Sequence, residues 1–154
     1  MLSFRLAVKE DYDDFFKMKS DYNNIAWGGF SQKPDYEKFK SWFLQQIDPE
    51  NKRKIYIVKK ENISVGYFNL EDVDEITSEI SYGVISEFTG LGIGTFIIRS
   101  ATSIFDKKIV AWVANDNIPS IKCFEKNSFA KTEETQIRNL PLLGGEHVFY
   151  KWVK

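Results

Sequence analysis

The sequence predicts an α/β fold of the α+β kind, in which a mixed sheet of six to seven strands is flanked by about four helices. Two observations lead to this prediction. Short strand-like stretches and longer stretches of helical period follow one another in the order β-α-α-β-β-β-α-β-α-β-β. The chain has 154 residues, of which 43% are hydrophobic, which suits one ordinary domain with a real core. We therefore expect a single domain over residues 1–154.

The first third of the chain is expected to hold one strand and two helices. Apolar residues alternate with others over residues 2–8, which is the period of a half-buried strand. Residues 10–20 are predicted to be helical, and a second helix is predicted after Pro34, up to about Ile47. Asn, Gly, Ser and Pro are frequent in the stretch between these helices, so it is predicted to be a loop with exposed aromatic side chains.

The middle of the chain is expected to form a three-stranded meander followed by a crossover. Strands are predicted at 54–60 and 64–70, separated by the short "ENI" of a hairpin, and at 76–85. Apolar residues at helical spacing predict an amphipathic helix from 93 to about 105, followed by a dense strand at 108–114. The crossover makes the strands at 76–85 and 108–114 parallel neighbours.

The last part of the chain is expected to add one helix and two strands. A helix is predicted from Asn117 to about Lys126, with Pro119 tolerated in the first turn, where a missing N–H costs nothing. The final strands are predicted at 129–137 and 147–153, joined by a stretch rich in Gly and Pro.

Composition excludes several classes of partner. A formal net charge of -1 gives no long-range attraction to nucleic acid or to anionic membranes. The single cysteine, Cys123, and the single histidine, His147, cannot build a structural zinc site, and we expect no metal. Charged residues interrupt the N-terminus where a signal peptide would be apolar, and no apolar run approaches the ~20 residues of a membrane span. We expect a cytoplasmic protein.

The segment "EFTGLGIGTF" places Gly90, Gly92 and Gly94 between a predicted strand and a predicted helix. The lysine of a P-loop is absent, and neither the glycine spacing nor the preceding meander fits a dinucleotide fold. Glycines before a helix still allow backbone N–H groups to reach phosphate oxygens, with help from the helix dipole. From the glycines alone, a pyrophosphate site and a tight turn remain equally open.

The segments "EFTGLGIGTFIIRSA" and "VANDNIPSIKCFEKNSF" are separated by one predicted strand. Together they resemble the acetyl-CoA-binding motifs of the GNAT superfamily of N-acetyltransferases. The first, "EFTGLGIGTFIIRSA", resembles the family's Q/R-x-x-G-x-G/A loop, with Gly92 and Gly94 in the glycine positions. The second, "VANDNIPSIKCFEKNSF", resembles the family's Asn-x-x-Ser-Ile…Glu-Lys-x-Gly-Phe stretch, with these residues in register: Asn117, Ser120, Ile121, Glu125, Lys126 and Phe129. The chain looks most like the bacterial subgroup that includes ribosomal-protein, aminoglycoside and amino-sugar acetyltransferases.

Three positions depart from the family pattern. Thr89 stands where the family has Gln or Arg, which removes one long side-chain contact but leaves the backbone amides. Ser128 replaces the glycine before Phe129, a local turn change. Phe124 stands where many members carry the tyrosine that protonates the departing thiolate, so that general acid is missing.

The resemblance implies acetyl-CoA as cosubstrate, bound along the loop and the strand before it. Residues 89–94 would hold the pyrophosphate, the gap between the parallel strands would admit the pantetheine arm, and a bulge-like opening at Val84 would free N–H groups for the thioester carbonyl. Asn117 would contact the pantetheine arm and also cap its helix. The expected cofactor-binding residues are Val84, Ile85, Thr89, Gly90, Leu91, Gly92, Ile93, Gly94, Thr95, Asn117, Ser120 and Phe124.

The same resemblance suggests the reacting groups. Glu79 lies at the strand position where several members carry a catalytic glutamate, so it is the expected base; a solvent-facing strand carboxylate is the alternative. In the absence of a tyrosine at 124, Tyr82, Tyr150 or bulk water could supply the proton, because a thiol of pKa ~8.5 is a tolerable leaving group. Cys123 is expected to be structural, and so is His147, with a role as base as its alternative. Asp72, Asp74 and Glu75 are expected to form a solvated turn, with a collar that attracts a cationic amine as the alternative.

Trp27 and Phe30, beside two glycines, are expected to form a lid over the acceptor. Trp42 and Tyr22 are further candidates for the acceptor side, although the helical spacing of Trp42 also suits a core residue. The expected function is acetyl transfer to the primary amine of a small molecule or protein N-terminus, by direct attack in a ternary complex. A catalytically silent CoA-binding sensor and a plain interaction domain are the alternatives. A homodimer is expected at the level of the family only.

Overall fold

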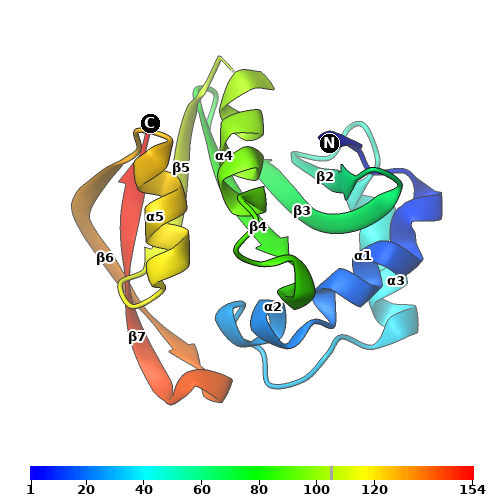
Figure 1. The fold of residues 1–154 in the computed structure, drawn as a ribbon, viewed down its shortest axis with the longest axis horizontal. Coiled ribbons are helices and arrows are strands. Elements are labelled where there is room, and N and C mark those ends of the chain that lie inside the picture. Colours follow the sequence, from blue (N-terminus) through cyan, green and yellow to red (C-terminus); the bar gives the residue numbers. More distant parts are fainter. Residues whose placement is uncertain (105) are drawn as a thin grey trace.

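The computed structural model describes residues 1–104 and 106–154, and Figure 1 shows their arrangement. The helices and strands are β1 (Leu2–Leu6), α1 (Tyr12–Lys19), α2 (Tyr22–Trp27), α3 (Tyr36–Gln46), β2 (Arg53–Lys60), β3 (Ile63–Asp72), β4 (Thr77–Val84), α4 (Ile93–Ile104), β5 (Lys108–Ala114), α5 (Ile118–Lys126), β6 (Ala130–Leu140) and β7 (Gly145–Val153). The helix that the sequence predicts up to Phe105 is described to Ile104, and Phe105 lies outside the described residues.

Within the described residues, seven strands form one mixed sheet in the order β1-β2-β3-β4-β5-β7-β6. The hairpin from β2 to β3 and the meander into β4 are antiparallel, and β4 and β5 form the parallel pair expected from the crossover through α4. The predicted mixed α/β fold is therefore confirmed, including its parallel neighbours.

Helices cover both faces of this sheet. α4 and α5 lie on one face, where Ile97, Ile98 and Phe124 pack against Phe68 and other strand residues. α1 and α3 lie on the opposite face and form a second core with Ile55, Ile57 and Tyr67 from the strands. β3 is buried on both of its faces over most of its length, as expected for a strand between two helical layers.

The parallel pair separates soon after it forms. β4 and β5 pair only at Thr77, Ser78 and Glu79, which lie opposite Lys108, Ile109 and Val110, although both strands continue beyond these positions. The other edge of β5 pairs with β7 over residues 110–114. The sheet is therefore open between β4 and β5, which is the gap that the family resemblance implies.

The predicted loop 20–34 is wrong in part, because it contains the short helix α2. The Asp21 carboxylate caps this helix by accepting from the Asn23 N–H at 3.2 Å, and Ile25 and Ala26 bury its inner face. Six residues cannot form a stable helix alone, so tertiary packing decides the structure where Asn and Gly in the sequence favour a loop. Trp27, expected in that loop, is the last residue of α2.

The end of α5 generates a stability prediction. Ser128 has a φ of 63°, in the left-handed region, and follows the Asn127 C-cap. The Ser128 and Phe129 N–H groups donate to the carbonyls of Glu125 and Phe124 at 3.0 and 3.1 Å, and the two phenylalanine rings pack at 5.0 Å. This is a Schellman motif, in which glycine is the favoured left-handed residue.

Ser128→Gly should therefore raise the free energy of unfolding by about 0.5–1 kcal/mol, because it removes the steric cost of a side chain at positive φ. Urea unfolding measures the change. Ser41→Gly is the matched control, since Ser41 is exposed within α3 and loses about 0.5 kcal/mol by helix propensity. Equal destabilisation by both substitutions would show that Ser128 carries no backbone strain.

Candidate active site

The glycine segment forms the start of α4 and leaves its first amides free. Gly90 and Gly92 both have a φ of +79°, which residues with a side chain rarely adopt. The Phe96 N–H donates to the Gly92 carbonyl at 3.0 Å, so the helical bonding begins there and the preceding N–H groups have no partner within the helix. Amides aligned at the positive end of a helix form a cradle suited to an anion.

Gly94 is required for a different reason, the close approach of α5. A Cβ at this position would lie 2.9 Å from the Cys123 sulfur and 3.7 Å from the Tyr82 hydroxyl oxygen. The Asn127 side chain joins the same helices, because its Nδ2 donates to the carbonyls of Thr95 at 3.2 Å and Cys123 at 2.8 Å. The start of α4 is thus fixed against the second half of α5.

The Thr89 side chain hydrogen-bonds to the main chain of the turn that precedes it. Its hydroxyl donates to the Ser86 carbonyl at 2.9 Å, in the 3-10 turn between β4 and the glycines. The Asp21 carboxylate accepts from the Ser86 N–H at 3.0 Å and the Ser86 hydroxyl at 2.8 Å, and the Asn23 amide also donates to that hydroxyl. The cap of α2 therefore anchors the glycine segment, a link that nothing in the local sequence pattern indicates.

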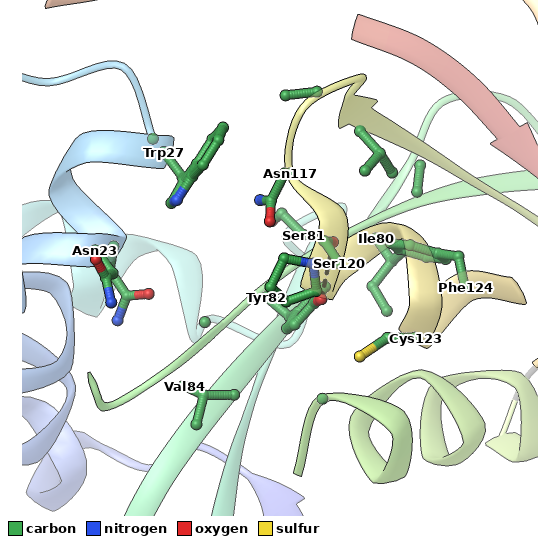
Figure 2. A pocket seen from close by; sticks show the side chains of 18 of the residues that line it. Asn23, Trp27, Ile80, Ser81, Tyr82, Val84, Asn117, Ser120, Cys123 and Phe124 are labelled. Carbon is green, nitrogen blue, oxygen red and sulfur yellow. Dashed lines mark hydrogen bonds between the residues drawn. The ribbon is translucent and has the colours of Figure 1, made fainter. Parts of the chain in front are cut away.

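A groove of about 940 Å³ runs from the glycine segment through the opening between β4 and β5 to α2. Figure 2 shows Asn117, Ser120 and Cys123 from α5 on one side, Trp27 and Asn23 from α2 on the other, and Tyr82 between them. The structure brings these predicted site residues together in the groove: Trp27, Phe30, Glu79, Tyr82, Val84, Thr89, Gly90, Gly92, Ile93, Gly94, Thr95, Asn117, Ser120 and Phe124.

Three predicted residues lie outside the groove lining. Ile85 is buried against the core of α1 and α3, and Leu91 is exposed. Tyr150 lies on β7, where Lys131 covers its ring at 3.9 Å. Asn117 is the N-cap residue of α5, where its carbonyl accepts from the Ile121 N–H at 3.0 Å, but its side chain makes no cap hydrogen bond and lines the groove.

The free amides at Val84 come from the splay and not from a bulge. β4 pairs with β3 without a shift of register from Ser78 to Val84, so the expected bulge-like opening is absent over these described residues. The Ile85 N–H donates to the Val65 carbonyl of β3 at 2.9 Å. Because alternate residues of a strand point their backbone groups to opposite sides, the N–H groups of Tyr82 and Val84 point toward β5, which has already separated.

Glu79 lies on the groove at the last paired position of β4 and β5. Burial raises the pKa of its carboxyl, and the neighbouring Glu71 acts in the same direction. Arg138, Arg53 and Lys151 oppose this shift. A half-buried carboxylate with a raised pKa is a better proton acceptor than an exposed one, which suits a general base.

Tyr82 places its hydroxyl at the junction of α4 and α5. The oxygen lies 2.9 Å from the Ser120 Oγ, and burial, together with the adjacent Cys123, raises the pKa of the phenol. Phe124 meets the Tyr82 ring edge to face at 6.1 Å and is itself buried. Tyr82 thus keeps its proton over the whole physiological range.

His147 and the acidic turn have local structural partners. The His147 Nδ1 lies 2.9 Å from a carboxylate oxygen of Asp116 and its Nε2 lies 2.7 Å from the Leu143 carbonyl oxygen. These acceptors raise the pKa of the imidazole. Asp72 accepts from the Ser78 hydroxyl at 2.7 Å and Asp74 accepts from the Ile76 N–H at 2.9 Å, so both carboxylates serve the β3–β4 turn as expected.

The acceptor end of the groove includes residues that sequence patterns do not reveal. Lys19 from α1 and Arg138 from β6 line the groove together with Trp27, Phe30 and Glu79. The only sequence signal for either cation is its position near a helix end or in an exposed strand, which is ordinary for Lys and Arg. Their placement depends on how distant elements pack.

Across residues 1–104 and 106–154, no helix is long and apolar enough to cross a bilayer. In the same residues, His, Cys, Asp and Glu side chains form no group of three or more that could hold a metal ion.

Comparison of the fold with solved structures finds proteins similar over nearly the whole chain. Spermidine N-acetyltransferase from Vibrio cholerae, in complex with CoA and spermine, has a TM-score of 0.86 at 16% identity, covering 99% of this chain and 94% of that chain. Aminoglycoside acetyltransferase AAC(6')-Ib with coenzyme A has a TM-score of 0.76 at 18% identity, with 98% and 94% coverage. Its complex with ribostamycin and coenzyme A has a TM-score of 0.76 at 18% identity, with 97% and 92% coverage. At these identities the likeness shows the fold alone.

Sequence comparisons add the family. A comparison with curated proteins gave no significant match. The model of the acetyltransferase (GNAT) domain family matches residues 2–130, which include β1, the glycine segment and α5. Because this match covers most of the chain and the sheet has the expected splay, the chain belongs to the GNAT acetyltransferase family.

Proposed function

We propose that the protein transfers an acetyl group from acetyl-CoA to a primary amine by direct attack in a ternary complex. The observation that supports this most is the single groove that joins the glycine segment, the opening between β4 and β5, and Glu79. Residues of both segments that resemble CoA-binding motifs line one part of this groove, and the Glu79 carboxylate lines another part. The acceptor would be a small molecule or a protein N-terminus.

The residues at the glycine end fit a CoA pyrophosphate. The free amides at the start of α4 would bind its oxygens, and Gly92 leaves open space where a side chain would otherwise project. Lys122 and Lys126, which line the same groove from α5, would add positive charge. Asn117 and Ser120 would contact the pantetheine arm. When bound, acetyl-CoA supplies the activated acetyl group as a thioester.

The opened strand would position and polarise the reacting carbonyl. The N–H groups of Tyr82 and Val84 face the gap and would donate to the thioester oxygen as negative charge develops on it. The amine nitrogen attacks the carbonyl carbon, the C–S bond breaks, and Glu79 accepts the proton that the nitrogen loses, directly or through one water. The products are the amide and CoA thiol.

The leaving sulfur needs a proton, and Tyr82 is the phenol of the groove lining that lies between α4 and α5. Its hydroxyl would donate a hydrogen bond to the sulfur, and Ser120 would orient that hydroxyl. Because the phenol is a weaker acid than a thiol, solvent would complete the proton transfer.

A catalytically silent CoA-binding protein is the second candidate. Phe124, at the position of the usual family tyrosine, favours it, because it cannot donate a proton. Release of CoA thiol from acetyl-CoA over a panel of primary amines separates the candidates: an enzyme releases it with at least one amine, whereas a silent binder is stabilised by acetyl-CoA without turnover.

Gly92→Ala should weaken acetyl-CoA binding at least about tenfold, because a side chain at a φ of +79° distorts the amide cradle. The thermal shift produced by saturating acetyl-CoA measures this loss. Gly144→Ala is the matched control, since Gly144 also has a positive φ of +87° and open space around it but lies far along the chain, before β7. Both variants should lose similar free energy of unfolding in the absence of ligand. An equal loss of acetyl-CoA affinity in both would show that the amides at the start of α4 do not bind acetyl-CoA.

Glu79→Gln should lower kcat/KM about a hundredfold or more, whereas Glu75→Gln in the exposed turn should leave it unchanged. Stability gives an independent readout of the pKa. Burial raises the folded pKa above the ordinary value of 4.5, so the folded state binds the proton more tightly than the unfolded state. The stabilising contribution of the protonated group is therefore lost as pH rises through that range.

The free energy of unfolding of Glu79→Gln, relative to the native sequence, should accordingly increase between pH 4 and pH 8. Denaturant unfolding of both proteins at the two pH values checks this sign. If this relative free energy of unfolding decreased with pH instead, the neighbouring cations would stabilise the Glu79 carboxylate and lower its pKa. That result would contradict the assignment of Glu79 as the base.

Tyr82→Phe should lower kcat by about tenfold without changing acetyl-CoA affinity, because a thiolate leaves tolerably without an acid. Tyr150→Phe, outside the groove, should have the activity of the native protein. Adding Phe124→Tyr to Tyr82→Phe should restore part of kcat by placing a phenol on α5. Unchanged kcat in Tyr82→Phe would show that the Tyr82 hydroxyl does not assist the departure of the sulfur.

A further inference from the structure

A second cavity of about 580 Å³ adjoins the acceptor end of the groove. The two cavities share Lys19, Asn24, Phe30 and Ser81 in their linings, so a molecule bound beside Glu79 can extend into the second one. Its lining is mostly polar, but it includes three aromatic side chains, Phe30 and the pair Phe39 and Trp42 from α3, whose rings stack at 5.0 Å. Trp42, a candidate for the acceptor side, lines this cavity and also packs against the core of α1 and α3.

The lining of this second cavity includes a buried hydrogen-bond acceptor, the side-chain oxygen of Asn69. Asn69 on β3 is only 4% exposed, and its Nδ2 donates to the Ser81 Oγ on β4 at 3.2 Å. The Asn69 Oδ1 is buried and has no hydrogen-bond partner among the described residues. A buried acceptor without a partner costs free energy unless a bound molecule supplies a donor.

The charges around the two cavities favour an anionic group as well as an amine. Lys19 lies 3.3 Å from the Tyr67 hydroxyl and covers the Tyr67 ring, and no carboxylate of the described residues lies within ion-pair distance of it. Arg138 is likewise held by the Phe149 ring and the Gln136 side chain, without a carboxylate partner in the described chain. Glu79 lines the same groove as both cations, and Arg138 is the cation that acts most on its carboxyl group.

The remaining charges do not change this balance. Arg53 in the second cavity pairs with Glu71 at 2.9 Å, and the Asp35 carboxylate keeps its negative charge while it caps α3 by accepting from the Lys38 N–H. Lys33 adds a further cation at the rim. A polyamine would meet more positive than negative charge here, whereas an acceptor carrying both an ammonium and a carboxylate could satisfy Glu79 and Lys19 together.

From this geometry we propose that the acceptor is a free amino acid with an aromatic side chain that can donate a hydrogen bond. This rests on the proposed function and names its substrate class. The amine lies at Glu79, the carboxylate pairs with Lys19, and the side chain enters the cavity beside Trp42 and donates to the Asn69 oxygen. Tryptophan has the required groups and serves as the probe.

Calorimetric titration of the protein, with and without saturating CoA, tests this without requiring turnover. L-Tryptophan should bind at least tenfold more tightly than tryptamine, which lacks only the carboxylate, and spermidine should bind more weakly than either. Lys19→Met should reduce tryptophan affinity about tenfold and leave tryptamine affinity unchanged, and Lys19→Arg should retain most of the tryptophan affinity.

Lys17→Met is the matched control, because Lys17 is exposed on the same helix and lines neither cavity. Tryptamine or spermidine binding as tightly as tryptophan would overturn the proposal, and so would undetectable binding of all three or an equal effect of the Lys17 and Lys19 variants. Failure of acetyl-CoA to stabilise the protein would instead overturn the proposed function, since amino-acid binding without CoA is measured separately.

Discussion

The separation of β4 from β5 after three paired positions is the constraint on which the rest of the site depends. A parallel pair that continued to Val84 would consume the backbone N–H groups of Tyr82 and Val84 and close the groove. Each strand is held by its other edge, where β4 keeps its antiparallel ladder with β3 and β5 keeps its ladder with β7. These outer ladders hold both strands in the sheet while the two facing edges stay apart. The facing edges therefore keep backbone groups without a strand partner, which a ligand in the gap can reach.

The alternation of β4 then divides the site into two halves. Ile80, Tyr82 and Val84 belong to the core beneath α4 and α5, where the CoA-like motifs lie, whereas Ser81 contacts Asn69 on the opposite face, beside α1 and α3. Glu79 shares the parity of Ser81, so its side chain lies on the same face of the sheet as Ser81, where it lines the groove. β4 thus presents Tyr82, proposed to contact the leaving thiol, and Glu79, proposed to accept the proton of the amine, to one groove that passes through the sheet.

Features carried by local pattern were predictable from the sequence, and those made by long-range packing were not. The glycine segment and α5 were recognisable because their spacing encodes backbone geometry directly: the positive φ of Gly92 and the helix start at Asn117 need only neighbouring residues. α2 was missed because its stability comes from buried Ile25 and Ala26 and from Asp21, which binds Ser86 across 65 positions. Lys19, Arg138 and Asn69 were missed for the same reason, since an isolated Lys, Arg or Asn has no periodicity that reveals its neighbours.

The pair formed by Tyr82 and Phe124 explains how the site can lack the usual tyrosine and still hold a phenol. Both rings lie in one apolar cluster, and the Tyr82 hydroxyl reaches Ser120, one turn before Phe124 on α5. A hydroxyl on Phe124 would sit on a side chain that is 2% exposed and would need a partner of its own in that cluster. Phenylalanine at 124 avoids that burial, while Tyr82 reaches the same helix junction from the strand and finds its partner in Ser120. The opened strand therefore places its own backbone donors and this hydroxyl together on one side of the groove.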